Sequence, residues 1–173
     1  MQPKHHALIG IATVPFLWPA VGPAATFVFL SASVVLIDLD HALDFLIHTR
    51  FSSFSIRKMF LYHRYLFQRI KRSDFLSLEP FHTVEFLALL VWLSVWSGSP
   101  LLQAATGGML LHFICDLLYL RKIGAFSARA HSMVEYLVRK RRMIRNGIPL
   151  EKPFQEAAQL CLGPTQGDPT GSC

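Results

Sequence analysis

Four apolar segments, arranged as two pairs, restrict this chain to architectures that bury or embed long hydrophobic stretches. The segments cover residues 7–18, 24–37, 84–96 and 101–120. The stretch from Pro19 to Pro23 interrupts the first pair, and the stretch from Ser97 to Pro100 interrupts the second. Proline and glycine at these places indicate tight turns between helices. The pattern therefore predicts two helical hairpins joined by a long polar section.

Composition and charge favour a small membrane protein over a soluble globule. The 173 residues are 52% hydrophobic and have a mean hydropathy of +0.37, yet the net charge is +6. All 17 lysines and arginines lie at Lys4, within 50–72 or within 121–152, and neither hairpin turn contains one. By the positive-inside rule, we expect a multi-pass inner-membrane protein with both termini and the central section on the cytoplasmic side.

These features predict an all-α integral membrane bundle that forms one domain over residues 1–160. Its expected parts are hairpins at 5–47 and 81–120, a cytoplasmic interfacial section at 48–80 and a basic helix at 121–150. Residues 161–173 are small, polar and proline-rich, which is typical of a disordered tail.

Basic and aromatic residues are interleaved in the central section at helical spacing, which indicates a helix lying on anionic lipid. Membrane lipids are therefore the expected partners. Nucleic acid is not expected, because the apolar segments already commit the chain to a membrane. The sequence does not indicate an oligomeric state.

The second apolar segment runs directly into Asp38-Leu-Asp-His-Ala-Leu-Asp44, which holds four ionisable side chains in seven residues. Such charges are costly in an apolar environment unless they are paired or bind a cation. On one continuous helix, Asp40, His41 and Asp44 would fall within an arc of about 100°, with Asp38 about 60° beyond it. Carboxylate and imidazole ligands on one face suit a divalent metal, zinc or manganese. The alternative is a solvated polar helix end.

Polar residues from all four segments fall at one depth when they are counted from the hairpin turns. His6 lies about 15 residues before the first turn and Asp38 about 17 after it. His82, His112 and Asp116 lie about 16, 14 and 17 residues from the second turn. At about 1.5 Å per residue, all five sit roughly 20–27 Å from the turns. The spacing predicts a shared layer near the cytoplasmic side.

The local spacings agree with a shared site. His112 and Asp116 are separated by four residues, and His82 and Glu85 by three, so each pair shares a helix face. The intervals from His6 to Asp40 and from His82 to Asp116 are both 34 residues. Helical bundles build metal sites from such inward-facing carboxylate and histidine pairs.

Four elements carry a resemblance to a known family: His6-x3-Gly10, Asp38-x-Asp40-His41, a histidine before the third segment, and His112-x3-Asp116. Over about residues 5–120 the chain resembles the bacterial inner-membrane metal-dependent hydrolase family, the LexA-regulated, YdjM-like group. It is more distantly similar to zinc-dependent phospholipase C and related single-strand nucleases. The resemblance implies an integral helical protein with metal-dependent hydrolase activity.

One departure from the family pattern concerns the third segment. Where the family has His-Arg followed by Thr-His-Ser, this chain reads Phe81-His82-Thr83-Val84-Glu85, so one histidine is missing. Glu85 is the residue that can replace it as a ligand. The metal count and the ligand set therefore stay open.

We expect a membrane-bound hydrolase in which a divalent metal, most simply zinc, activates water against a phosphoester or similar electrophile. The candidate metal ligands are His6, with His5 as its alternative, Asp40, His41, His82, His112 and Asp116. The candidate general bases are Asp38, Asp44 and Glu85. The basic surroundings favour an anionic, phosphate-containing and lipid-like substrate. The alternatives are a membrane protein that transports ions or metals and a scaffold without catalytic activity.

Overall fold

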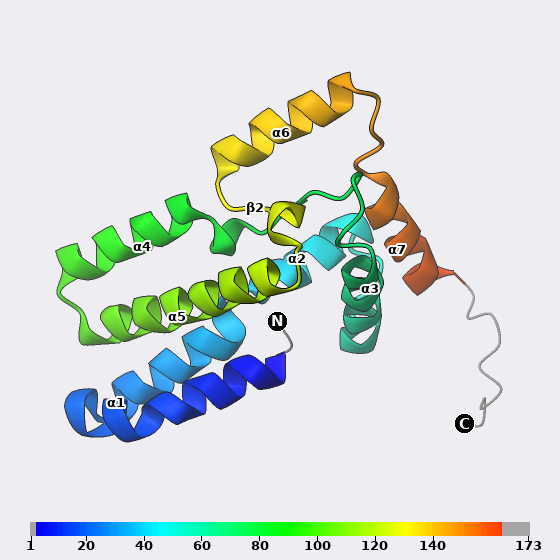
Figure 1. The fold of residues 1–173 in the computed structure, drawn as a ribbon. Coiled ribbons are helices and arrows are strands. Elements are labelled where there is room, and N and C mark those ends of the chain that lie inside the picture. The colour runs from blue at the N-terminus through cyan, green and yellow to red at the C-terminus, as the bar shows by residue number, and fades with distance from the viewer. Residues whose placement is uncertain (1–2, 164–173) are drawn as a thin grey trace, which may run out of the picture.

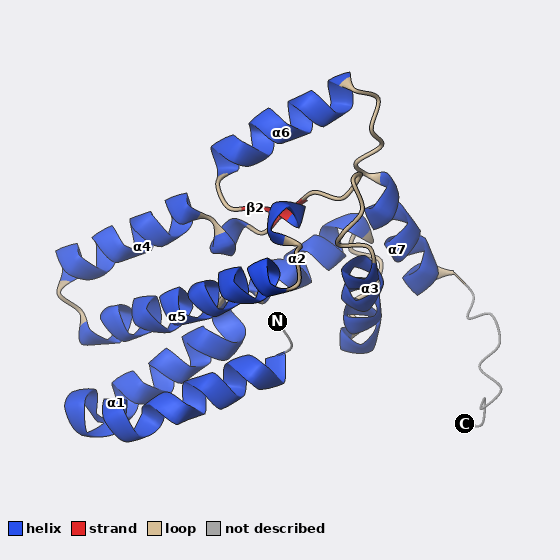
Figure 2. Ribbon diagram, viewed as in Figure 1, coloured by secondary structure: helices blue, strands red, loops and turns tan. Residues whose placement is uncertain are grey.

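The computed structural model describes residues 3–163, with side chains from His6 onward. The all-α class is confirmed, because 77% of the structure is helical. Within the described part of the chain, strand pairing is confined to β1 (Ser77–Leu78) and β2 (Arg129–Ala130), which run parallel. Figure 2 shows how small this strand pair is beside the helices. The predicted disordered tail lies largely outside the described residues, which end just after α7 (Lys152–Leu162).

The first predicted hairpin is present in α1 (Pro3–Ser31), which reverses direction at Gly22. Gly22 has a φ of 79°, a backbone conformation that glycine adopts without steric cost. Figure 1 shows the two arms of α1 lying side by side. The hydroxyl of Thr26 donates a hydrogen bond to the Gly22 carbonyl at 2.8 Å and so fixes the start of the second arm.

The second arm does not continue as one regular helix into the acidic stretch, in contrast to the prediction. Residues Ala32–Leu36 form a π-helix (η1), and the chain turns at Asp38 before α2 (Leu39–His48) begins. Single π turns inside helices occur often at functional sites. The turn changes the direction in which Asp38 and Asp40 point relative to the helical wheel that the sequence suggested.

The second hairpin consists of α4 (Val84–Ser97) and α5 (Pro100–Lys122). Gly98 ends α4 with a φ of 62°, and Ser99 caps α5 by accepting a hydrogen bond from the Leu102 amide. In Figure 1, α5 lies between α4 and α1, and it contacts both. Buried apolar residues join these helices: Ala32, Ile37, Leu87, Met109 and Phe113.

Gly108 allows α5 to approach the backbone of η1 closely. A Cβ atom at this position would overlap the carbonyl oxygen of Phe29 and lie 3.0 Å from the Ser33 nitrogen. At Gly107, by contrast, an added Cβ would meet only the Phe29 ring, at 3.4 Å. The absence of a side chain at Gly108 therefore sets the distance between α5 and the segment that leads to Asp38.

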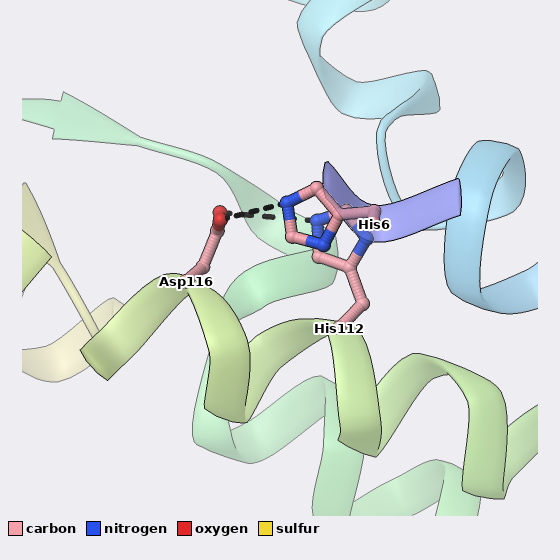
Figure 3. A group of neighbouring side chains, drawn as sticks. All are labelled: His6, His112 and Asp116. Carbon is pink, nitrogen blue, oxygen red and sulfur yellow. Dashed lines mark hydrogen bonds and ion pairs between the residues drawn. The ribbon is translucent and has the colours of Figure 1, made fainter. Parts of the chain in front are cut away.

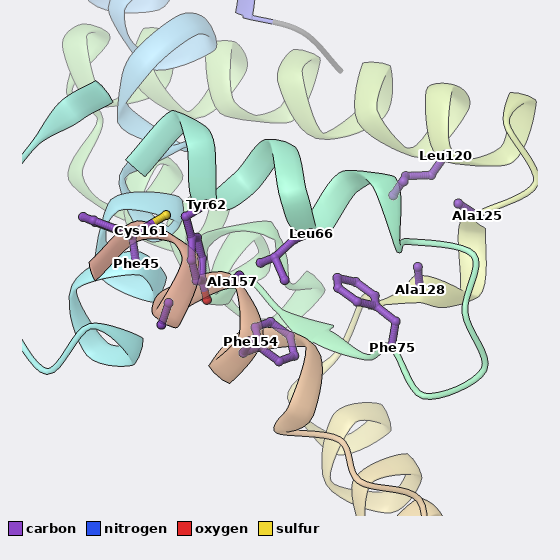
Figure 4. Close-up of a cluster of buried hydrophobic side chains, with 11 residues drawn as sticks. Phe45, Tyr62, Leu66, Phe75, Leu120, Ala125, Ala128, Phe154, Ala157 and Cys161 are labelled. Carbon is purple, nitrogen blue, oxygen red and sulfur yellow. The ribbon is translucent and has the colours of Figure 1, made fainter. Parts of the chain in front are cut away.

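A second apolar core lies beyond the hairpins, in the polar sections of the sequence. It joins α2, α3 (Ile56–Gln68) and α7 and is centred on Phe45, Tyr62 and Phe154. Figure 4 shows these side chains gathered between the helices. The section at 48–80 was predicted to lie on lipid, but half of α3 packs into this core.

The predicted basic helix at 121–150 is shorter in the structure. It corresponds to α6 (Met133–Arg145), while a 3-10 turn, η3 (Phe126–Ala128), and then β2 occupy the preceding residues. Another 3-10 turn, η2 (Pro80–His82), follows β1 and leads into α4. The pairing of β1 with β2 thus joins the chain just before η2 to the chain just before α6.

Two helical segments, residues 6–48 and 100–122, are long and apolar enough to cross a membrane, whereas α4 is shorter. The outward faces of both hairpins carry exposed aromatic residues, including Phe16 at 77% and Trp96 at 75% exposure. Soluble monomers rarely expose large contiguous apolar surfaces of this kind.

Replacing Gly108 by alanine should push α5 away from η1 and destabilise the protein by about 1–3 kcal/mol, the usual cost of overpacking. Gly107→Ala is the matched control, and it should leave stability unchanged or raise it slightly through helix propensity. Thermal unfolding of the detergent-solubilised variants measures the difference. Equal unfolding temperatures for the two variants would contradict the close approach at Gly108.

Candidate metal centre

Imidazole and carboxylate groups from separate elements meet at the base of the two hairpins, opposite their turns. We call this group the His–Asp cluster: His6 of α1, Asp38 before α2, His82 at the end of η2, and His112 and Asp116 of α5. All of these except Asp38 are buried, with exposures of 5% or less. The sequence therefore predicted correctly that these residues lie together, and the His/Asp groups among them could hold a metal ion.

His82 and His112 are the two central histidines of the cluster. Each is held by the ring nitrogen that faces away from the cluster. Nδ1 of His82 lies 2.9 Å from Oδ2 of Asp40, and Nδ1 of His112 lies 2.7 Å from the Ser33 carbonyl. Because a carbonyl only accepts, His112 must donate from Nδ1, which leaves the lone pair on Nε2. A carboxylate or carbonyl partner on the far nitrogen is the usual support of a metal-binding histidine.

The inward-facing Nε2 atoms of His82 and His112 are buried and make no hydrogen bond within residues 3–163. Their nearest acidic neighbours are two carboxylates. Oδ1 of Asp38 lies 3.7 Å from the first and 3.4 Å from the second, and Oδ2 of Asp116 lies 3.8 Å from both. Tetrahedral ligands about 2.0–2.2 Å from a zinc ion stand roughly 3.3–3.6 Å apart. The 3.4 Å separation lies within this range, and the other three exceed it by 0.1–0.2 Å.

His6 covers one side of this arrangement. Its ring stacks on His112 with centroids 3.7 Å apart and planes 4° from parallel, and its Nε2 lies 3.1 Å from Oδ1 of Asp116. Figure 3 shows Asp116 facing both rings. His6 thereby fixes the carboxylate of Asp116 as well as offering a ligand of its own.

Two alternative ligand groups can be drawn, His6 with His112 and Asp116, and Asp38 with His82 and His112. Both need Nε2 of His112, and Nδ1 of that ring is already bound to Ser33. Because both groups need the same atom, they cannot each hold an ion at the same time.

Asp40 has a different place from the ligand position that the sequence suggested. Its Oδ2 accepts from His82 Nδ1 and from the Phe81 amide at 3.2 Å. The carboxylate thus lies behind His82 and orients it. Residues two positions apart on a helix point about 160° from each other, so Asp40 faces away from Asp38.

Glu79 and Arg129 belong to the site, although the sequence analysis did not select them. The parallel pairing of Ser77 with Arg129 brings the two together, and their side chains form an ion pair. Nη1 of Arg129 also lies 3.3 Å from Oδ2 of Asp116, so one buried cation connects the pair to the cluster. Burial alone would raise the pKa of the Glu79 carboxyl, but the Arg129 guanidinium and two nearby histidines lower it below its ordinary value.

Three other predicted residues take different positions. His41 lies at the rim, partly exposed, with Nε2 3.5 Å from Asp38. Asp44 accepts from the Tyr62 hydroxyl at 3.1 Å and pairs with His48, in the direction of the second core. The side chain of His5 lies outside the described residues.

Glu85 is held at the N-terminus of α6, where its carboxylate accepts hydrogen bonds from the Ser132 hydroxyl and the Met133 amide. These contacts orient it toward α6 rather than toward the two central histidines. They give it a structural role, joining α4 to α6, in place of the base or ligand role that the sequence suggested.

The chain matched no protein-family model, no curated protein and no solved structure with which it was compared. The chemistry of the site is therefore inferred from its own geometry.

Removing the Arg129 cation should cost more stability than removing one of its anionic partners, because Arg129 neutralises two carboxylates. In metal-free protein, Arg129→Met should destabilise by about 3–5 kcal/mol, and Glu79→Gln by about 1–3 kcal/mol. Thermal unfolding measures both. The exposed pair Arg72–Asp74, at 2.7 Å, provides the control, and Arg72→Met should hardly change the unfolding temperature. A larger loss for Glu79→Gln than for Arg129→Met would contradict this assignment.

Proposed function

We propose that this protein is a membrane-embedded, metal-dependent hydrolase with one divalent ion, zinc, at the His–Asp cluster. The observation that carries the proposal is the pair of buried Nε2 atoms on His82 and His112, both fixed from behind and both lacking a hydrogen bond among the described residues. A buried polar atom left unpaired costs about 1–3 kcal/mol. An ion at this place would offset that cost for both rings at once.

Combining the two groups, we assign the ion to His82, His112 and Asp116, because Oδ2 of Asp116 lies 3.8 Å from Nε2 of both histidines, and Asp38 would act as the general base. Asp116 is already fixed by His6 and Arg129, which suits a permanent ligand. The side chain of Asp38 is 24% exposed against 6% for Asp116, so it borders the open side of the cluster. Three protein ligands and one open position are typical of catalytic rather than structural zinc.

Bound zinc would polarise a phosphoester or similar group and lower the pKa of water toward neutrality. Asp38 would accept the proton of the attacking water. His41, whose Nε2 lies 3.5 Å from Oδ1 of Asp38, would pass a proton to the leaving group.

We further propose that both hairpins enter the inner membrane from the cytoplasmic side, with Gly22 and Gly98 at their deep ends and both termini in the cytoplasm. From His6 to Gly22 a helix extends about 24 Å, and the 14 residues of α4 about 21 Å, against roughly 30 Å of hydrocarbon. The cluster would then lie near the inner leaflet. The basic residues of α3 and α6 would lie at the cytoplasmic lipid surface.

Purified protein should contain one zinc ion per chain, measured by elemental analysis after detergent extraction. His112→Ala should abolish the metal, because it removes one of the two central ligands. Asp40→Asn should weaken metal affinity by about 10- to 100-fold, because it loosens the support behind His82.

His131→Ala is the matched control, since His131 contacts the Phe126 carbonyl rather than the cluster, and it should retain the metal. A screen with soluble phosphodiesters and phosphomonoesters then separates an enzyme from a transporter or a scaffold. Metal retained in His112→Ala would refute the site, and a metal-loaded protein that turns over no ester would refute the hydrolase.

A further inference from the structure

An apolar groove runs between α4 and α5 on the outside of the second hairpin. It has a volume of about 420 Å³, which lies within the usual range of about 300–1,000 Å³ for ligand sites. Its lining is entirely apolar: Val84, Leu87, Ala88, Val91 and Trp92 of α4, with Leu110 and Phe113 of α5. No hydrogen-bonding side chain lines it, so a peptide backbone laid in it would lose its hydrogen bonds.

One end of the groove lies at the same level of the second hairpin as the His–Asp cluster. Val84 follows His82 by two residues, and Phe113 is adjacent to His112 on α5. From Val84 to Trp92 the groove follows α4 for about 12 Å toward the deep end of the hairpin. An extended hydrocarbon chain lying along it would therefore reach the cluster with its polar end.

Arg129 supplies a binding group for an anion at that end. It is 4% exposed, and its Nη1 is anchored to Glu79 and Asp116. Its Nε and Nη2 are buried and make no hydrogen bond within the described part of the chain. A guanidinium with free N–H groups is well shaped to bind two oxygens of a phosphate.

We propose that the ligand of this site is a phosphate-bearing amphiphile, with its phosphate bound by Nε and Nη2 of Arg129 beside the His–Asp cluster and its hydrocarbon chain in the groove between α4 and α5. The inference takes the hydrolytic role of the His–Asp cluster from the proposed function. It adds the chemical class of the substrate. The groove accounts for the chain, because hydrocarbon needs no hydrogen bonds, and Arg129 accounts for the anionic head.

Trp92 provides a direct test that does not depend on turnover. In a Trp18→Phe, Trp96→Phe background it is the one remaining tryptophan of the three in the chain. The protein is held in dodecyl maltoside micelles, which carry no phosphate, with and without zinc, and titrated with hexadecyl phosphate brominated along its chain. Brominated hexadecanol, which has the same chain without the anion, is the matched probe. The phosphate should quench Trp92 saturably, at a concentration at least about tenfold lower than the alcohol.

One pair of variants and one single variant locate the ligand. Ala88→Phe fills the exposed side of the groove and should reduce quenching by the phosphate to the level of the alcohol. Leu89→Phe, next along α4 but outside the lining, should leave it unchanged. Arg129→Lys keeps the charge but loses the planar fork, and should weaken the phosphate preference by about fivefold or more. Monodisperse elution and helical circular dichroism verify that each variant is folded.

Equal quenching by phosphate and alcohol, or unchanged saturation in Ala88→Phe, would overturn the inference. The outcomes that would refute the proposed function are different from these. Hydrolysis of small soluble phosphodiesters without saturable quenching would refute the amphiphile site alone, whereas saturable quenching with no hydrolysis of any ester would refute the hydrolase alone.

Discussion

The close contact of α5 with the η1 backbone is the constraint on which the site depends. Gly108 removes the side chain that would hold the two apart, and one helical turn later His112 reaches the Ser33 carbonyl at 2.7 Å. That hydrogen bond decides which nitrogen of His112 faces the cluster. A packing detail between two apolar helices thus determines the protonation pattern of a polar group, since hydrogen-bond partners select histidine tautomers.

Charge balance explains why so many ionisable groups can be buried together. Asp38, Asp40, Glu79 and Asp116 bring negative charge, and Arg129 is the buried cation that reaches two of them. Uncompensated carboxylates in an apolar environment would be strongly destabilising. The proposed divalent cation would offset the negative charge that remains.

The sequence predicted the features of the fold that follow from regular helical geometry. Proline and glycine located the hairpin reversals at Gly22 and Gly98, and a fixed rise per residue brought His6, His82, His112 and Asp116 to one depth. The sequence did not predict the features that depend on irregular backbone. The π-helix at Ala32–Leu36 and the turn that follows it leave no periodic signal in the sequence.

Arg129 is placed in the site by the parallel pairing of two-residue strands, which are too short to leave a sequence pattern. In the sequence it is one of many basic residues in its section of the chain.

The π turn also affects the phase of the helices on either side of it. Because a π turn holds more residues than an α turn, the second arm of α1 and helix α2 are out of phase. Deletion of one residue between Ala32 and Leu36 would turn the whole acidic stretch by about 100°.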